Sequence, residues 1–226
     1  MTKKIIYIFL FLSIISCQND KVKRENKTEH LTDIENEKIN VRLGNFTTIP
    51  KIDFELNSYI EDNSDTLKIV TCSDFVYEPF GKIKTKNDLK NSFLKNLNFI
   101  DRIDTLDNEA EAIEFQILQN NQNKLILFFN NSDEGVRESY VQKAEIINNE
   151  IHLEKGIKIN MSKQIFFLTF YDEFPSKLIS KYNIVSFISC VDGVIQNFNF
   201  RNGKLKLIEI KSTGNWNIPY EKKTTP

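Results

Sequence analysis

The segment Ile184–Ile210 reads IVSFISCVDGVIQNFNFRNGKLKLIEI and decides the fold. Its apolar, partly alternating runs are separated by Asp192-Gly193 and by Asn202-Gly203. Both dipeptides are typical of two-residue hairpin turns, because the central residues of a type I′ turn need a positive φ angle. The sequence therefore predicts three antiparallel strands, at Ile184–Cys190, Val194–Phe200 and Leu205–Ile210.

A second set of strand signals lies earlier in the chain. Leu67–Cys72 is rich in β-branched residues and is bounded by polar turn residues, which predicts a strand. Alternating residues with hairpin-length gaps then predict an antiparallel meander, and Asn148-Asn149 turns the chain into a last short strand. The expected strands of this meander are Ile113–Ile117, Leu125–Phe129, Ser139–Ile147 and Ile151–Leu153.

One helix is expected before each meander. Thr85 resembles a helix cap, and apolar residues at near-helical spacing predict a helix from Lys86 to Leu97. Ser162 is a similar cap before Gln164–Tyr171. That second segment is apolar enough to be a buried strand instead, and we favour a helix because Ser162 and Pro175 bracket it.

The fold class expected from these elements is α+β, with two helix-plus-antiparallel-meander repeats packed as one body. Three apolar residues follow each cap at the same offsets of +4, +8 and +12. They are Leu89, Phe93 and Leu97 after Thr85, and Phe166, Phe170 and Phe174 after Ser162. This agreement predicts an internal duplication, with repeats at residues 67–153 and 154–211. The alternative is that two unrelated amphipathic helices share the spacing.

The second repeat resembles a known unit. Residues 156–163 read GIKINMSK, lead into the expected helix, and are followed by three strands with an Asn-Gly turn. This arrangement is similar to the helix-plus-meander unit of the beta-lactamase-inhibitor-protein-like fold, which the small lipoprotein of the outer-membrane barrel-assembly machinery shares. The resemblance implies a sheet surface that binds other proteins without catalysis.

The N-terminus carries the features of a secretory signal peptide. Lys3 and Lys4 precede the apolar run Ile5–Ile15, which is too short for a membrane span, and a small residue, Ser16, precedes Cys17. The stretch around Cys17 resembles a bacterial lipobox, which implies cleavage before Cys17, acylation of its thiol and a lipid anchor in a bacterial membrane. The alternatives are an ordinary cleaved signal with an incidental cysteine, or an uncleaved anchor.

Composition changes divide the chain further. After Cys17 the sequence is rich in Lys, Glu, Asp and Asn without sustained periodicity, which predicts a disordered tether. Folded structure is expected to begin between Gly44 and Phe54. The predicted organisation is a signal peptide at 1–16, the lipidated cysteine and tether at 17–42, the α+β body at 43–211 and a C-terminal tail at 212–226.

Charge and hydrophobic content limit the class of function. The 226 residues carry a formal net charge of −1, so the sequence lacks the concentrated basic surface that nucleic-acid binding requires. A hydrophobic content of 40%, with 18 Phe, suffices for a large core. We therefore expect a globular protein. The resemblances add that it belongs to the cell envelope, anchored in the outer membrane if there are two membranes, and that its partners are the membrane and another envelope protein.

Two cysteines remain besides Cys17. Cys72 and Cys190 each end a strand-like run, and an extracytoplasmic compartment permits a disulfide between them. The alternative, which we favour from the sequence, is two separate buried thiols, because free cysteine is often buried.

No residue pattern predicts catalysis, a cofactor or a metal site. Ser92-Phe93-Leu94-Lys95 matches the Ser-x-x-Lys motif of penicillin-binding proteins, but its companion motifs are missing from the sequence. His152 is expected on the polar, exposed face of a short strand, away from any metal-ligand spacing. The sequence therefore favours a protein that is not an enzyme.

The candidate binding residues are large aromatic side chains outside the expected cores, because aromatic residues dominate interface energetics. They are Phe75, Tyr77, Phe80, Trp216 and Tyr220. The expected function is a non-catalytic protein-binding or scaffold lipoprotein. An inhibitory or immunity lipoprotein that blocks another protein's active site is the alternative, and an enzyme of unrecognised type is less favoured.

Overall fold

The computed structural model describes residues 39–61, 65–83, 86–89, 92, 94–95, 97–105, 112–119, 122–130, 138–191 and 193–212. The chain divides into two compact units, Met1–Glu37 and Lys38–Pro226. All described residues belong to the second unit. The predicted signal peptide, Cys17 and nearly all of the predicted tether lie outside the described residues, as do Trp216 and Tyr220, so these predictions stay predictions.

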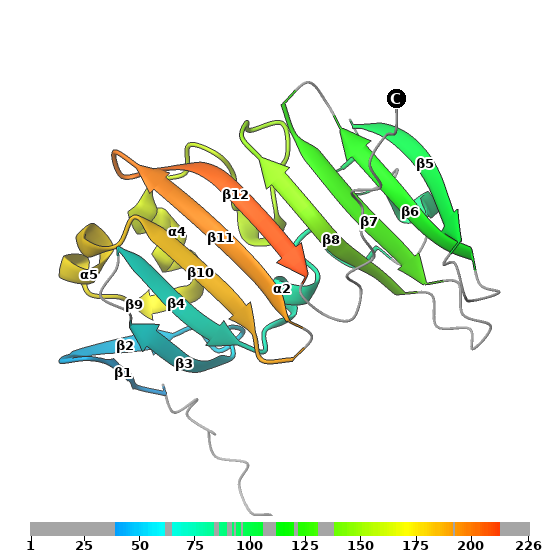
Figure 1. Cartoon of the computed structure of the whole chain (residues 1–226). Coiled ribbons are helices and arrows are strands. Elements are labelled where there is room, and N and C mark those ends of the chain that lie inside the picture. Colours follow the sequence, from blue (N-terminus) through cyan, green and yellow to red (C-terminus); the bar gives the residue numbers. More distant parts are fainter. Residues whose placement is uncertain are drawn as a thin grey trace, which may run out of the picture. The chain divides into compact units, whose positions relative to one another are not determined.

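The described body is α+β, and most of its elements are strands. Nine strands form one sheet in the order β3-β4-β10-β11-β12-β8-β7-β6-β5, which Figure 1 shows side by side. Their bounds are β3 Leu56–Glu61, β4 Thr66–Thr71, β5 Asn98–Thr105, β6 Ala112–Gln119, β7 Lys124–Asn130, β8 Glu138–Ile146, β10 Ile184–Ser189, β11 Val194–Arg201 and β12 Lys204–Ser212.

The C-terminal meander confirms the predicted hairpins. β10 pairs antiparallel with β11, and β11 pairs antiparallel with β12. Asn202 and Gly203 both have positive φ angles, 53° and 70°, as a type I′ turn requires. Gly193, in the preceding turn, has a φ of 59°.

The earlier meander is also present, but one of its four strands is not the predicted one. β6, β7 and β8 pair antiparallel in sequence order, and β5 adds a strand at the sheet edge. The expected strand Ile151–Leu153 is wrong, because His152 makes only an isolated bridge to Lys158. The two meanders join through their last strands, since β12 pairs antiparallel with β8.

One ladder of the large sheet is parallel. β4 lies between β3 and β10, and it runs parallel to β10 with Thr66 opposite Ile184 and Thr71 opposite Ser189. This pairing joins residues that are far apart in the sequence. No local turn signal could have indicated it.

A second, three-stranded sheet consists of β1 Val41–Leu43, β2 Phe46–Pro50 and β9 Tyr171–Glu173. The first strand of the described residues begins at Val41, slightly before the expected start of folded structure. The sequence predicted neither this sheet nor β3.

The two predicted helices are present near their expected positions, but one of them is shorter than predicted. α4 spans Lys163–Phe170, and the Ser162 hydroxyl accepts a hydrogen bond from the Ile165 N–H at 3.2 Å, which confirms the predicted capped helix. The expected helix from Lys86 to Leu97 is too long, because α3 ends at Leu89 and β5 begins at Asn98. The remaining helical elements are α2 Asp74–Tyr77, α5 Ser176–Lys181 and the 3₁₀ turn η1 Glu154–Gly156.

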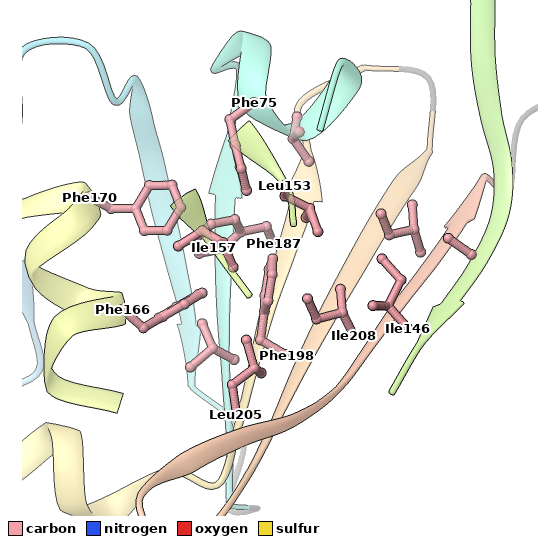
Figure 2. Packing of buried hydrophobic residues seen from close by; sticks show 14 of the residues in the cluster. Phe75, Ile146, Leu153, Ile157, Phe166, Phe170, Phe187, Phe198, Leu205 and Ile208 are labelled. Carbon is pink, nitrogen blue, oxygen red and sulfur yellow. The ribbon is translucent and has the colours of Figure 1, made fainter. Parts of the chain in front are cut away.

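Phenylalanine dominates the core between α4 and the sheet. Phe166 and Phe170 of α4 point toward Phe187 of β10 and Phe198 of β11, as Figure 2 shows. The ring centroids of Phe166 and Phe198 are 4.8 Å apart, and those of Phe170 and Phe187 are also 4.8 Å apart. Burying each such ring contributes about 1.5 to 3 kcal/mol relative to exposure. This cluster fixes α4 on the sheet.

Candidate functional site

Two of the predicted binding residues are core residues. Phe75 lies in α2 and Phe80 follows it, and each is only 2% exposed. The Phe75 ring packs against Phe170 with a centroid distance of 5.0 Å. The prediction that Phe75 and Phe80 form a binding surface is therefore wrong, because the connector folds back onto the sheet.

Tyr77 is half-buried and has a structural role. Its hydroxyl lies 3.3 Å from Cys190 Sγ and accepts a hydrogen bond from the Val191 N–H at 3.2 Å. The side chain thus holds α2 against the end of β10. Part of the Tyr77 side chain stays exposed, so its predicted binding role remains a prediction.

Cys72 and Cys190 form a disulfide, so the preference for two separate thiols is wrong. Their Cα atoms are 5.1 Å apart. The parallel register explains this approach, because Thr71 and Ser189 are opposite each other and each cysteine is the next residue in its chain. Cys190 is exposed, and its N–H donates to the Thr71 carbonyl at 3.1 Å.

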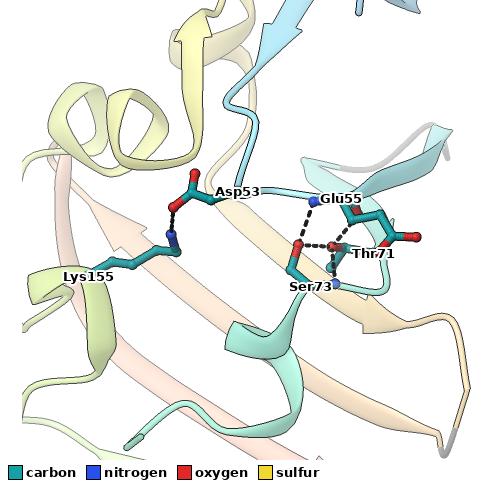
Figure 3. Close-up of polar contacts among 5 residues, drawn as sticks. All are labelled: Asp53, Glu55, Thr71, Ser73 and Lys155. Carbon is teal, nitrogen blue, oxygen red and sulfur yellow. Dashed lines mark hydrogen bonds and ion pairs between the residues drawn. The ribbon is translucent and has the colours of Figure 1, made fainter. Parts of the chain in front are cut away.

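Thr71 and Ser73, the residues on either side of Cys72, belong to a compact group of polar contacts that Figure 3 shows. The Thr71 hydroxyl donates to the Glu55 carbonyl at 2.6 Å, and its oxygen lies 2.8 Å from the Ser73 Oγ. The Ser73 Oγ in turn accepts from the Glu55 N–H at 2.7 Å. These bonds satisfy the polar groups where β3 and β4 meet α2.

Asp53 and Lys155 form an ion pair, also drawn in Figure 3. The hydrogen bond from Lys155 lowers the pKa of Asp53 below its ordinary value of 3.8, although partial burial opposes this shift. The pair connects the segment before β3 to η1. Both side chains keep contact with solvent, so the pair is a surface tie.

Lys163 is a buried cation at the start of α4, only 4% exposed. Its Nζ donates to the Tyr182 carbonyl and lies 3.5 Å from the Asn183 Oδ1. Burial lowers the pKa of Lys163, while the charge of Asp65 opposes that effect. The amine fastens α4 to the segment after α5.

Gln196 joins β11 to α2 in a similar way. Its side-chain amide donates to the carbonyls of Phe75 and Val76, at 3.2 and 2.9 Å. Both carbonyls lie in a helix of four residues, which is too short to supply hydrogen-bond donors for them. The Gln196 amide supplies these donors instead. Gln196 and Lys163 were not singled out by sequence reasoning.

The two residues considered for chemistry have local structural roles. The Ser92 hydroxyl donates to the Leu89 carbonyl at 2.8 Å and accepts from the Leu94 N–H at 3.1 Å. His152 is half-buried rather than exposed, since it lies in the bridge to Lys158. Among the residues that the structure describes, no group of three His, Cys, Asp or Glu side chains is placed to hold a metal ion.

The outer side of α4 exposes apolar side chains. Ile165 is 56% exposed and Leu168 is 44% exposed, although Phe166, Phe167 and Phe170 of the same helix are buried. Residues three apart lie on one helix face, so Ile165 and Leu168 form a continuous strip, which we call the α4 strip. The feature of the sequence that could have indicated this strip is that α4 carries apolar residues on every side, more than the sheet can cover.

In the described part of the chain, no helix has the length and apolar content needed to cross a membrane. No protein-family model, curated protein or solved structure matches this chain.

Proposed function

We propose that this chain is a lipid-anchored protein of a bacterial cell envelope, and that its folded body binds another envelope protein without catalysis. The observation that carries the binding role is the exposure of Ile165 and Leu168 on α4. Leaving apolar area in water costs about 25 cal/mol per Å² relative to burial. A partner that covers the strip would recover that free energy.

The helix that carries the strip is held rigidly. Its inner face packs on the sheet through Phe166 and Phe170, and Ser162 caps its first turn. Lys163, the first residue of α4, also donates a hydrogen bond to the segment after α5. A rigid apolar surface loses little conformational entropy on binding, which supports a recognition role.

The charge of this surface indicates the chemistry of the partner. The exposed residues of α4 are Gln164, Ile165 and Leu168, none of which is charged. An uncharged aliphatic strip fits an apolar patch on a second protein better than an acidic or basic one. The proposed occupant is therefore an apolar surface of an envelope protein.

Support for the anchor comes from the sequence. The basic start, the apolar run and Ser16-Cys17 together match a lipoprotein signal. Each buried methylene of an acyl chain contributes about 0.8 kcal/mol, so two or three chains would hold the body at the membrane for long periods. Mass spectrometry of the N-terminal peptide tests this step, and an unmodified thiol at Cys17 contradicts it.

We also propose that residues 67–153 and 154–211 arose by duplication. The first range contains α3 followed by the four-stranded meander β5 to β8, and the second contains α4 followed, after β9 and α5, by the three-stranded meander β10 to β12. Antiparallel pairing of the two last strands, β8 and β12, fits two units related by a local two-fold axis. The short α3 is the weakest part of this similarity.

The binding role is tested by charge substitution in the α4 strip. We expect Ile165→Asp with Leu168→Asp to abolish partner capture from detergent-solubilised envelopes, because a desolvated carboxylate opposes binding. Ile147→Asp is the matched control, since Ile147 is 41% exposed and lies outside α4. Equal capture by both variants contradicts the assignment, and self-association through the strip would make a second copy the occupant.

A further inference from the structure

Strands β8 and β12, which join the two meanders, carry charged side chains on one face of the sheet. Their buried residues, such as Ile146 and Ile210, belong to the core. Successive residues of a strand point to opposite faces, so the alternate residues lie on the face away from the core, which we call the outer face. Four of these residues are charged, and we call them the charge quartet. They are Lys143 and Glu145 of β8, and Glu209 and Lys211 of β12.

Like charges are opposite each other in the quartet. The register places Lys143 opposite Lys211 and Glu145 opposite Glu209. Side chains that are directly opposite in an antiparallel pair have Cβ atoms about 4.5 to 5.5 Å apart, and like charges at such positions are destabilising. The quartet therefore consists of a basic row and an acidic row, which are about 7 Å apart along the strands.

Among the residues that the structure describes, no ion pair joins a lysine of the quartet to a glutamate. Glu209 instead accepts a hydrogen bond from the Asn199 side-chain amide at 3.3 Å. Lys143, Glu145 and Lys211 are exposed, and Glu209 is half-buried. Both rows thus present their charge on the outer face. A surface with the inverse order of charges would offset the repulsion within each row.

We propose that the outer face of β8 and β12 is the interface between two copies of this chain, related by a two-fold axis. An axis that is parallel to the rows and midway between them turns the acidic row of the second copy over the basic row of the first. Lys143 then faces Glu145 of the second copy, and Lys211 faces Glu209 of the second copy. The two reciprocal pairs follow from the symmetry, because a two-fold interface uses the same patch on both chains.

Uncharged residues continue both rows on the β11 side of the quartet. Ile195 of β11 follows in the basic row and Asn197 in the acidic row. β10 adds Ile188 to the first row and Ser186 to the second. Both isoleucines are half-buried. The same axis places each isoleucine over an amide or hydroxyl side chain of the second copy, so burial of the remaining apolar area adds to the attraction of the charges.

The order of the charges favours a second copy over a surface of one sign. An acidic surface above the quartet would be repelled by Glu145 and Glu209, and a basic surface by Lys143 and Lys211. A nucleic acid or an anionic membrane would meet the first of these repulsions. The second copy carries both signs at the matching spacing, because it has the same register.

This dimer would leave the α4 strip free. α4 packs on the core face of the sheet, where Phe166 contacts Phe198, and the quartet lies on the other face. A dimer formed through the outer face therefore presents two α4 strips. Two sites on one assembly strengthen binding to a partner that offers more than one copy of its own surface.

Charge exchange tests the interface in the full chain in mild detergent. Lys143→Glu with Lys211→Glu makes the quartet entirely acidic, and Glu145→Lys with Glu209→Lys makes it entirely basic. Each variant alone should self-associate about 100-fold more weakly than the unsubstituted chain, because like charges now face each other. An equal mixture of the two variants should associate again. Sedimentation equilibrium measures all three.

The control is Lys158→Glu with Lys177→Glu, which changes the net charge equally at exposed lysines outside the sheet and should leave the dimer intact. The unsubstituted dimer should also dissociate as the ionic strength rises from about 0.01 M to about 1 M, where the Debye length falls from about 30 Å to about 3 Å. An unsubstituted chain that stays monomeric at low ionic strength overturns the proposal. A dimer that both charge variants retain also overturns it.

A zero-length carbodiimide crosslink keeps the test decisive if a variant unfolds. Unsubstituted chains with ordinary and with heavy nitrogen are mixed in equal amounts. The crosslink should join the peptide containing Lys143 of one isotope to the peptide containing Glu145 of the other. Crosslinks confined to peptides of a single isotope show contact within one chain only, which contradicts the assignment.

Discussion

The two parts of the large sheet are stabilised in different ways. β3, β4, β10, β11 and β12 pack against α2 and α4 through the phenylalanine cluster, and the β4–β10 pair joins distant residues. β8, β7, β6 and β5 instead pair with their neighbours in sequence. The first part depends on non-local contacts, whereas the second is built mostly from local hairpins.

The disulfide relates the two parts of the sheet to each other. Cys72 and Cys190 belong to the first part, and the 118-residue separation between them contains the whole of the second part. The meander β5 to β8 therefore lies within the loop that the disulfide closes. A loop of that length restricts the unfolded chain strongly.

The largest expected effect comes from removing this bond. Cys72→Ala with Cys190→Ala should lower the free energy of unfolding by about 4 to 5 kcal/mol, the chain-entropy value for a loop of this length. Urea unfolding of the full chain measures the loss. Cys17→Ala is the control, because it leaves the disulfide intact. Two separate unfolding transitions would show that the two parts of the sheet are not one cooperative unit.

Truncating a core side chain should cause a smaller loss of stability, and the size of that loss should differ between the two parts of the sheet. Phe166→Ala should destabilise the protein by about 3 to 5 kcal/mol, because deleting a buried ring loses transfer free energy and leaves a cavity. Phe166 lies within 6 Å of five other rings, with centroid distances of 4.8 to 5.8 Å. Leu127→Ala, in the second part, should cost about 2 to 4 kcal/mol. Thermal unfolding compares them, and a larger loss for Leu127→Ala would contradict this picture.

Local sequence signals predicted the hairpins. Asp192-Gly193 and Asn202-Gly203 specify β-turns through backbone geometry alone, so β10, β11 and β12 follow from residues close in the chain. α4 was predicted for a similar reason, since Ser162 satisfies a backbone donor within its first turn.

These local signals could not predict pairings between residues that are far apart in the sequence. The parallel pairing of β4 with β10 depends on the register of two distant strands, and the disulfide follows from that register. The expected helix up to Leu97 failed because apolar spacing near Leu89 also suits a short helix followed by a loop and strand. Phe75 and Phe80 were misassigned because a helix of four residues is too short to show periodicity.

The candidate site illustrates the same limit. Aromatic residues in a connector look available for binding in the sequence, but tertiary packing buries Phe75 and Phe80 and engages Tyr77. Ile165 and Leu168 look like core residues in the sequence, yet the sheet can cover only one side of α4. The covered side is the one that carries the phenylalanines, because their rings bury more apolar area than Ile165 and Leu168 would.

The smallest expected effect concerns the tie between the segment before β3 and η1, which follows the meander. Because Lys155 lowers the pKa of Asp53, the unfolded state binds more protons than the folded state near and below pH 3.8. The contribution of Asp53 is therefore complete above that pH and is lost as the pH falls through the lower folded-state pKa. Since Asp53 keeps 59% of its side chain exposed, solvent screening limits this contribution to less than about 1 kcal/mol.

Asp53→Asn should accordingly lower the free energy of unfolding slightly at pH 7, and this loss should be smaller at pH 2, because protonation of Asp53 removes the charge as the pH falls below 3.8. Glu55→Gln is the matched control, because Glu55 contributes its backbone to the bonds with Thr71 and Ser73 and its side chain is exposed. Urea unfolding at both pH values measures the difference. A loss at pH 2 equal to that at pH 7 would show that Asp53 acts through packing, and that its charge does not connect the two parts of the chain.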